Sequence, residues 1–126
     1  MSTPVKILIA DDDTLMHMLY RHHLERAGFQ VLTATNGREA LEVAARELPQ
    51  LIFMDIMMPE VDGMTALREL KKADATKDIP VIVITANVSE YNASRQEAIT
   101  RGAVGFLSKP LSPTQMLDEI RRQLPG

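Results

Sequence analysis

Short apolar runs alternate with stretches of mixed polarity along the whole chain. The apolar runs lie at residues 5–10, 30–34, 51–58, 81–84 and 104–107, and a polar or chain-breaking residue follows each of them. The third run carries Asp55 within it, where its strand is expected to end. Short apolar or β-branched runs with such boundaries are typical of buried β-strands. The stretches between them repeat apolar residues every three or four positions, which predicts amphipathic helices. This alternation indicates a parallel sheet covered by helices on both faces.

The first helix is expected to begin after Asp13 and to end near Ala27, before Gly28. Aspartate is a favourable N-cap, and glycine often follows the last helical residue. The positions predicted to form its buried stripe are Met16, Leu19, Tyr20, His23, Leu24 and Ala27. Leu15 and Met18 lie off this stripe, so we expect their side chains to be exposed.

Two later helices carry capping motifs at their starts. Asn36 followed by Glu39 resembles a capping box, and Ser112 with Pro113 and Gln115 combines a serine cap, a proline at the first position and a capping-box glutamine. The first of these helices is expected to run through the apolar residues Ala40, Leu41, Ala44 and Leu48. The second is expected to be buried through Met116, Leu117, Ile120 and Leu124.

The third and fourth helices differ in how much apolar surface they offer. The third contains Met64, Leu67 and Leu70 at helical spacing. The fourth is expected to start near Ser89, and its apolar positions are Tyr91, Ala98 and Ile99. Because so few apolar side chains hold it, we expect the fourth helix to be the most loosely held element.

The relative polarity of the strands predicts their order in the sheet. The three most apolar strands, the first, third and fourth, should be central, which gives the order 2-1-3-4-5. In such doubly wound sheets the ligand site lies beyond the carboxyl ends of the strands, where the strand order reverses. That point lies between the first and third strands, so Asp11, Asp12 and Asp55 should meet there, with Thr85 and Lys109 on neighbouring strand ends.

Length, charge and composition exclude several classes of protein and several kinds of metal site. With 126 residues the chain is expected to form one domain spanning 1–126. A net charge of -3 provides no basic field, so we expect no direct binding of nucleic acid. There is no cysteine for a thiolate site, and His17, His22 and His23 lack the spacing of a helical metal pair. No apolar run is long enough to span a membrane, and a cytoplasmic location is expected.

Three carboxylates in one crevice repel one another, and a cation would relieve that repulsion. Oxygen ligands with room for water suit Mg²⁺. A carboxylate beside Mg²⁺, with a lysine ammonium and a hydroxyl nearby, is suited to accept a phosphoryl group as a nucleophile. The residue types at the strand ends therefore indicate phosphoryl transfer chemistry.

An acidic pair, a single aspartate, a threonine and a lysine followed by proline come in this order at successive strand ends. In this arrangement the chain resembles the receiver domains of two-component response regulators over essentially its whole length. The resemblance implies a flavodoxin-like (βα)5 fold that binds Mg²⁺. It also implies that Asp55 is the phosphoacceptor, that Asp12 binds Mg²⁺ directly and that Asp11 holds it through water. Thr85 would bind a phosphoryl oxygen, and Lys109 would pair first with the carboxylate and then with the phosphate.

The resemblance implies further roles around this centre. The backbone carbonyl of Met57 would be a metal ligand, and the amide of Ala86 would bind a phosphoryl oxygen. The side chains of Met57 and Asn87 would tune hydrolysis, and Met57, being apolar, cannot orient water. Thr85 and Phe106 would form the switch, although Phe106 is often tyrosine in the family and cannot offer a hydroxyl.

The same resemblance implies the partners. A histidine kinase or a histidine phosphotransfer protein would supply the phosphoryl group, and a downstream output protein or a fused output domain would respond. We expect Leu15 and Met18 to dock the donor, and the face formed by the fourth helix, fifth strand and fifth helix to carry the output. Such a chain is a signalling receiver that catalyses only its own phosphorylation and dephosphorylation.

An alternative from another class is a phosphatase of the haloacid dehalogenase type with Asp11 as its nucleophile. Asp11 and Asp13 are separated by one residue, as that family requires. However, that family also expects an acidic pair after its lysine, and only Asp118 and Glu119 follow Lys109, within a predicted helix. The receiver interpretation is therefore favoured.

Overall fold

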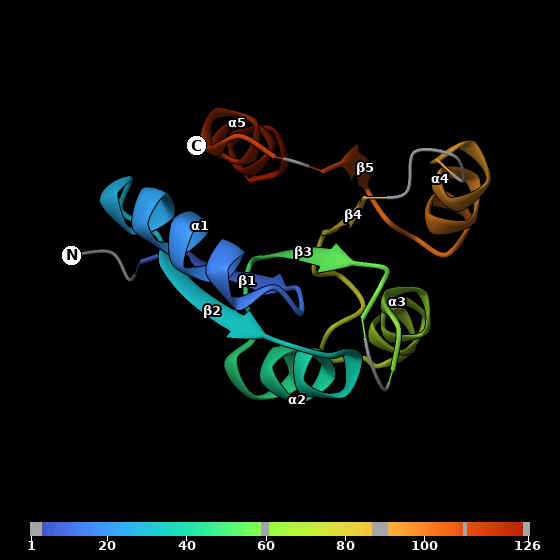
Figure 1. Cartoon of the computed structure of the whole chain (residues 1–126). Coiled ribbons are helices and arrows are strands. Elements are labelled where there is room, and N and C mark those ends of the chain that lie inside the picture. The colour runs from blue at the N-terminus through green and yellow to red at the C-terminus, as the bar shows by residue number, and fades with distance from the viewer. Residues whose placement is uncertain (1–3, 59–60, 87–90, 110, 125–126) are drawn as a thin grey trace.

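The computed structural model describes residues 4–58, 61–86, 91–109 and 111–124 (Figure 1). Within these ranges the chain alternates five strands with five helices. The strands are β1 (Lys6–Ala10), β2 (Gln30–Ala34), β3 (Leu51–Asp55), β4 (Val81–Thr85) and β5 (Gly105–Ser108). The helices are α1 (Thr14–Arg26), α2 (Gly37–Glu47), α3 (Gly63–Lys72), α4 (Tyr91–Thr100) and α5 (Pro113–Gln123).

The strands form one parallel sheet in the order β2-β1-β3-β4-β5, which confirms the predicted order. The register aligns the carboxyl ends of the two strands that precede the acidic residues. Ala10 pairs with Met54, so Asp11 lies level with Asp55. On the other side, Thr85 pairs with Ser108, which places the residue after β5 beside the end of β4.

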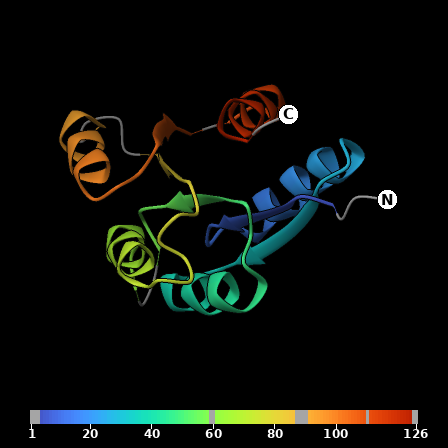
Figure 2. The same ribbon diagram turned by 180° about the vertical axis from the view of Figure 1, so that it is seen from behind.

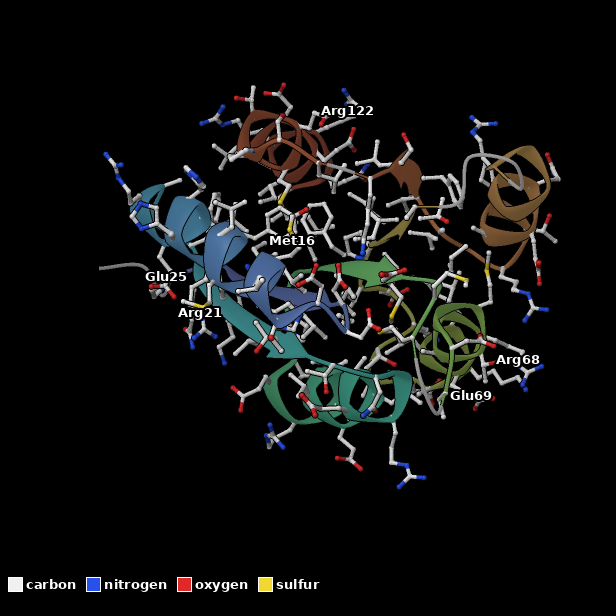
Figure 3. All side chains as sticks on the ribbon, in the orientation of Figure 1. Met16, Arg21, Glu25, Arg68, Glu69 and Arg122 are labelled. Atoms are coloured by element: carbon white, nitrogen blue, oxygen red, sulfur yellow. The ribbon has the colours of Figure 1, made fainter. Side chains whose placement is uncertain are left out.

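Helices cover both faces of the sheet, as the sequence predicts. Figure 1 shows α1 and α5 on one side and α2, α3 and α4 on the other, and Figure 2 shows the same division from behind. Because side chains alternate along a strand, Phe53 packs on the α1/α5 side while Ile52 packs on the opposite side. Met16 lies between α1 and α5, whereas Arg122 points outward from α5 (Figure 3).

The buried face of α1 differs from the predicted stripe. Tyr20 and Leu24 are buried as expected, but the third buried residue is His17. The predicted positions that lie outside the core are Leu19, His23 and Ala27. The spacing of the buried residues still fits one helical face, so the helix is rotated relative to the expected stripe. Its contacts with β2 and α5 set this rotation.

The helix caps follow the sequence closely. Asp13 caps α1 by accepting from the backbone N–H groups of Leu15 and Met16. Ser112 and Gln115 form both halves of the capping box at α5. At α2, Asn36 accepts from the Glu39 N–H. The helix predicted to run through Leu48 ends one residue earlier, because Leu48 is its left-handed C-cap with φ of 48°, and the Leu48 side chain is 52% exposed.

The fourth helix buries little apolar surface through its described side chains, those of residues 95–100. It starts at Tyr91, and the start predicted near Ser89 lies outside the described residues. Among the α4 side chains that the structure describes, only Ala98 is buried, and Ile99 is 42% exposed. Val104 was predicted to begin the fifth strand, but it precedes β5 and is 48% exposed. No helix in the described ranges is both long and apolar enough to cross a lipid bilayer.

Gly63, the first residue of α3, lies in close contact with the end of β3. A Cβ atom on Gly63 would lie 2.2 Å from the backbone oxygen of Asp55 and 2.6 Å from the Cα of Ile56. Alanine normally favours a helix over glycine by about 1 kcal/mol, but overpacking of this kind costs about 1–3 kcal/mol. We therefore expect Gly63→Ala to lower the free energy of unfolding in urea denaturation.

Thr65→Ala, two residues along the same helix, is the matched control and should change that free energy by less than about 0.5 kcal/mol. A Gly63→Ala chain as stable as the unsubstituted one would show that the helix can move away from β3 at little cost.

Candidate functional site

Three carboxylates meet at the carboxyl ends of β1 and β3. Asp11 and Asp12 follow β1 directly, and Asp55 is the last residue of β3. One oxygen of each lies within 4.8 Å of the others. Asp11 is 0% exposed and Asp55 is 3% exposed, whereas Asp12 is open to solvent. The structure thus brings together the acidic residues that the sequence predicted to meet.

Lys109 joins the two buried carboxylates. Its Nζ lies 2.7 Å from Asp11 Oδ2 and 2.6 Å from Asp55 Oδ2. The backbone N–H of Lys109 donates to the carbonyl of Thr85 at 2.8 Å, which ties the end of β5 to the end of β4. The ammonium therefore bridges side chains from two strands while its own backbone is held by a third.

The second oxygen of each buried carboxylate accepts from a backbone amide. Asp55 Oδ1 accepts from the N–H of Met57 at 2.8 Å, and Asp11 Oδ1 accepts from the N–H of Asp13 at 3.0 Å. In both cases the donor lies two residues further along the chain, which is the geometry of an Asx turn. Sequence reasoning assigned Asp13 only to the helix cap and missed that its backbone N–H donates to Asp11. The signal was present, because an aspartate directly after a strand, here Asp11, often forms such a turn.

Burial and pairing have opposite effects on the pKa values of Asp55 and Lys109. Burial raises the pKa of Asp55 above its ordinary value, and the hydrogen bonds from Lys109 and from the Met57 amide only partly offset this effect. Burial tends to lower the pKa of Lys109, but the hydrogen bonds to Asp11 and Asp55 outweigh it, so the pKa of Lys109 is raised. The site therefore favours the charged form of Lys109 and makes ionisation of Asp55 more costly than it is in water.

The donor set fits a hard divalent cation. Three carboxylates face one ammonium, which leaves two negative charges without a partner when all three acids are ionised. Every candidate ligand atom is oxygen, and the exposure of Asp12 leaves room for water on that side. Mg²⁺ prefers such ligands and retains several water molecules. Asp11, Asp12 and Asp55 together are thus able to hold a metal ion.

The other predicted site residues surround this cluster on neighbouring elements. Thr85 ends β4 and is 1% exposed, and the following residue, Ala86, is exposed. Phe106, on β5, is 7% exposed and belongs to the core on the α4 side of the sheet. Met57 is 61% exposed in the loop after β3. Asn87 lies outside the described residues.

Two apolar side chains of α1 are exposed, as the sequence predicts. Leu15 is 75% exposed and Met18 is 71% exposed. Leu15 belongs to the first turn of α1, two residues after Asp13. These side chains are therefore available for contact with another molecule.

Tyr20 is a neighbour of the site that sequence reasoning missed. Its side chain is fully buried in the core beside Leu111. Burial raises the pKa of its hydroxyl, the charge of Lys109 lowers it, and the charge of Asp11 raises it. An aromatic residue on the apolar stripe of a helix is predicted only to be buried in the core. No feature of the sequence indicates that the Tyr20 hydroxyl lies near these charges.

The sequence model of the "Response regulator receiver domain" family matches residues 7–121. The chain belongs to this family. It is therefore a receiver domain of two-component signalling. The alternative of a haloacid-dehalogenase-type phosphatase with Asp11 as nucleophile is not supported. The acids which that interpretation required lie within α5, where Glu119 pairs with Arg122 at 2.5 Å.

Curated relatives and solved structures agree with this assignment. The polar-differentiation response regulator DivK of Brucella anthropi is 34% identical over 122 residues, which cover 96% of this chain and 97% of that protein. The chain spans only 47% of one further curated relative and 25% of another.

Two solved structures share the fold over nearly all of the chain. The chemotaxis protein CheY4 of Vibrio cholerae matches with a TM-score of 0.89 at 31% identity, covering 97% of this chain and 100% of that one. The receiver domain of the sensor histidine kinase PA1611 of Pseudomonas aeruginosa, with a magnesium ion coordinated in its active site cleft, matches with a TM-score of 0.85 at 25% identity, covering 96% and 98%.

The raised pKa of Asp55 predicts how stability depends on pH in the absence of divalent cations. The folded chain binds this proton more tightly than the unfolded chain, so the free energy of unfolding falls as pH rises from the unfolded pKa through the folded pKa. Asp55→Asn removes the titrating carboxyl group and with it this fall in the free energy of unfolding. We expect the variant to be more stable than the unsubstituted chain at about pH 7 and to lose that advantage below about pH 4, near the ordinary pKa of aspartate.

Urea denaturation in the presence of EDTA across this pH range measures the effect. Asp118→Asn removes an exposed carboxylate on α5 and controls for the change in net charge. An Asp55→Asn chain less stable than the unsubstituted one at neutral pH would mean that the ion pair with Lys109 outweighs the cost of burial.

Proposed function

We propose that Asp55 accepts a phosphoryl group from a histidine kinase or a histidine phosphotransfer protein. The observation that supports this role is the Lys109 ammonium, 2.6 Å from Asp55 Oδ2 at the edge where β1 and β3 end together. A carboxylate oxygen of Asp55 attacks phosphorus, and the bond from phosphorus to the leaving group of the donor breaks. Of the three clustered acids, Asp55 is the central one, because its strand β3 lies between β1, which precedes Asp11, and β4, which ends at Thr85.

The neighbouring strand ends would hold the transferred group. Because Asp55 pairs with Ile84, Thr85 and Ala86 follow directly beside the acceptor. The Thr85 hydroxyl and the Ala86 amide donate hydrogen bonds to phosphoryl oxygens. Lys109, which pairs with the free carboxylate, then pairs with the phosphate. This arrangement provides positive charge and donors where negative charge arrives.

The metal expected here is Mg²⁺. Asp11, Asp12, Asp55 and the backbone carbonyl of Met57 would hold it, and when bound it neutralises charge on the arriving phosphoryl group. The all-oxygen donor set and the excess of two negative charges support this choice, as does the magnesium-containing cleft of the PA1611 receiver domain.

The chain would act as a signalling receiver that catalyses only its own phosphorylation and dephosphorylation. Its readout surface would be the face formed by α4, β5 and α5, recognised by an output protein or a fused output domain. The thin anchoring of α4, with Ala98 buried and Ile99 exposed, supports this choice because such an element shifts at little cost. Thr85 and Phe106 would couple the phosphoryl group to that face.

The central test is phosphorylation by acetyl phosphate. We expect a phosphoryl adduct, detected by intact mass, that depends on Mg²⁺ and is lost in Asp55→Asn. Asp62→Asn, a conservative change at the N-cap of α3, serves as the matched control and should be labelled normally. Labelling that persists in Asp55→Asn, or that chelation leaves undiminished, would refute the assignment.

The exposed residues Leu15 and Met18 are expected to dock the protein donor. Replacing both by aspartate should slow phosphotransfer from that donor by about tenfold or more, since each lost contact at the centre of an interface costs about 1 kcal/mol or more. Labelling by acetyl phosphate should be unchanged. Leu48→Asp changes an exposed leucine at the C-cap of α2 and is the control. Equal slowing of both reactions would indicate a folding defect instead of a docking role.

The switch is tested at Thr85. In Thr85→Ala the hydroxyl that contacts the phosphoryl group is gone, so Asp55 should still be labelled while the response of the readout face weakens. The expected result is smaller phosphorylation-induced amide shifts in NMR spectra at Phe106 and along α4, because a ligand shifts an equilibrium only through its differential contacts. Thr33→Ala, on edge strand β2, is the control. A wild-type shift pattern in Thr85→Ala would place the coupling elsewhere.

A further inference from the structure

Methionine exposure is uneven across the molecule. Among the methionines in the part of the chain that the structure describes, Met18 is 71% exposed and Met57 is 61% exposed. The others are wholly or partly shielded by the core: Met16, Met54, Met58, Met64 and Met116. Because peroxides reach exposed thioethers most readily, these two side chains are the ones open to oxidation.

Met57 differs from Met18 in its relation to the phosphorylation site. The residue that carries this exposed thioether also donates its backbone N–H to Asp55 Oδ1 at 2.8 Å. Only three side-chain bonds separate the sulfur from the Cα of Met57, so the sulfur stays within one side-chain length of the backbone that contacts the acceptor carboxylate. Met18 lies in the second turn of α1 and borders a small cavity with His17, Arg21 and Thr33.

We propose that Met57 is an oxidation site at which a peroxide shortens the lifetime of the phosphorylated chain. This inference rests on the proposed function of Asp55. In the modification, a sulfur lone pair attacks one oxygen of hydrogen peroxide, the O–O bond breaks, and an S–O bond forms. Sulfur loses two electrons, and the peroxide is reduced to water after proton transfer to the departing hydroxide. The product, methionine sulfoxide, is returned to methionine by sulfoxide reductases.

The consequence follows from the polarity of the two forms. Hydrolysis of an aspartyl phosphate requires a water molecule oriented towards phosphorus, and the thioether of Met57 is a poor hydrogen-bond acceptor. A sulfoxide oxygen accepts a hydrogen bond strongly and is able to hold such a water molecule. A positioned general base accelerates a reaction by about 10²–10⁴-fold. A neutral acceptor removes no proton, so we expect a smaller acceleration, of roughly three- to tenfold.

The first measurement maps oxidation without requiring phosphorylation. The full chain is treated with hydrogen peroxide, and peptide mass spectrometry follows sulfoxide formation at each methionine over time. Sulfoxide should form at Met57 and Met18 well before it forms at Met54 and Met116, which are 0% exposed. Oxidation of Met57 no faster than that of Met54 would overturn the proposal, whatever the behaviour of Asp55.

The second measurement is the lifetime of the phosphorylated chain, labelled with acetyl phosphate and followed after removal of the donor. Peroxide treatment should shorten it by roughly three- to tenfold in the unsubstituted chain and in Met18→Leu. It should have no effect in Met57→Leu, which keeps an apolar side chain of similar size but cannot be oxidised. Met57→Gln should mimic the oxidised form, and methionine sulfoxide reductase should restore the longer lifetime of the unsubstituted chain.

Three results separate the possible failures. A shortened lifetime in peroxide-treated Met57→Leu would assign the effect to another residue and overturn the proposal. An unchanged or longer lifetime with Met57 fully oxidised would overturn it as well. A chain that is oxidised at Met57 but takes no phosphoryl group would overturn the proposed function of Asp55, and with it the consequence drawn for Met57.

Discussion

The ion pair network of Lys109 with Asp11 and Asp55 is the interaction on which the site depends. Burying two like charges costs several kcal/mol for each ion unless partners compensate, and both carboxylates are nearly inaccessible to water. The ammonium contacts one oxygen of each at 2.6–2.7 Å, and a backbone amide contacts the other. Removing the lysine would leave two buried carboxylates facing each other without a cation.

This network explains why the strand order matters for function. The acids come from the ends of β1 and β3, and the lysine follows β5. The three segments converge only because the sheet has the order β2-β1-β3-β4-β5 with its carboxyl ends level. The link from the Lys109 N–H to the Thr85 carbonyl also joins the charge network to β4, where Thr85, the proposed switch residue, lies. Charge at Asp55 is therefore connected to the readout side of the sheet through neighbouring backbone.

Stability is distributed unevenly around this centre. The central strands β3 and β4 are fully buried, and Gly63 allows α3 to approach the end of β3 so closely that a Cβ atom would clash. On the other side of the site, α4 contributes one buried side chain among those described, Ala98. A rigid end of the sheet therefore holds the acceptor while a thinly held helix lies next to the strand that carries Phe106. Such a contrast suits a domain that must keep its chemistry in place and still change shape.

The sequence alone determined the features that depend on local chemistry. Apolar runs predicted the strands, the caps at Asp13 and Ser112 predicted where two helices begin, and differences in strand polarity predicted the sheet order. Tertiary packing decided the rest, because it depends on how separate elements meet. It turned α1 so that His17 is buried and Leu19 is exposed, and it placed Leu48 at a left-handed C-cap outside the core. The resemblance predicted that Lys109 pairs with the Asp55 carboxylate, but only the packed structure also places its ammonium 2.7 Å from Asp11, because that distance depends on how three strand ends meet.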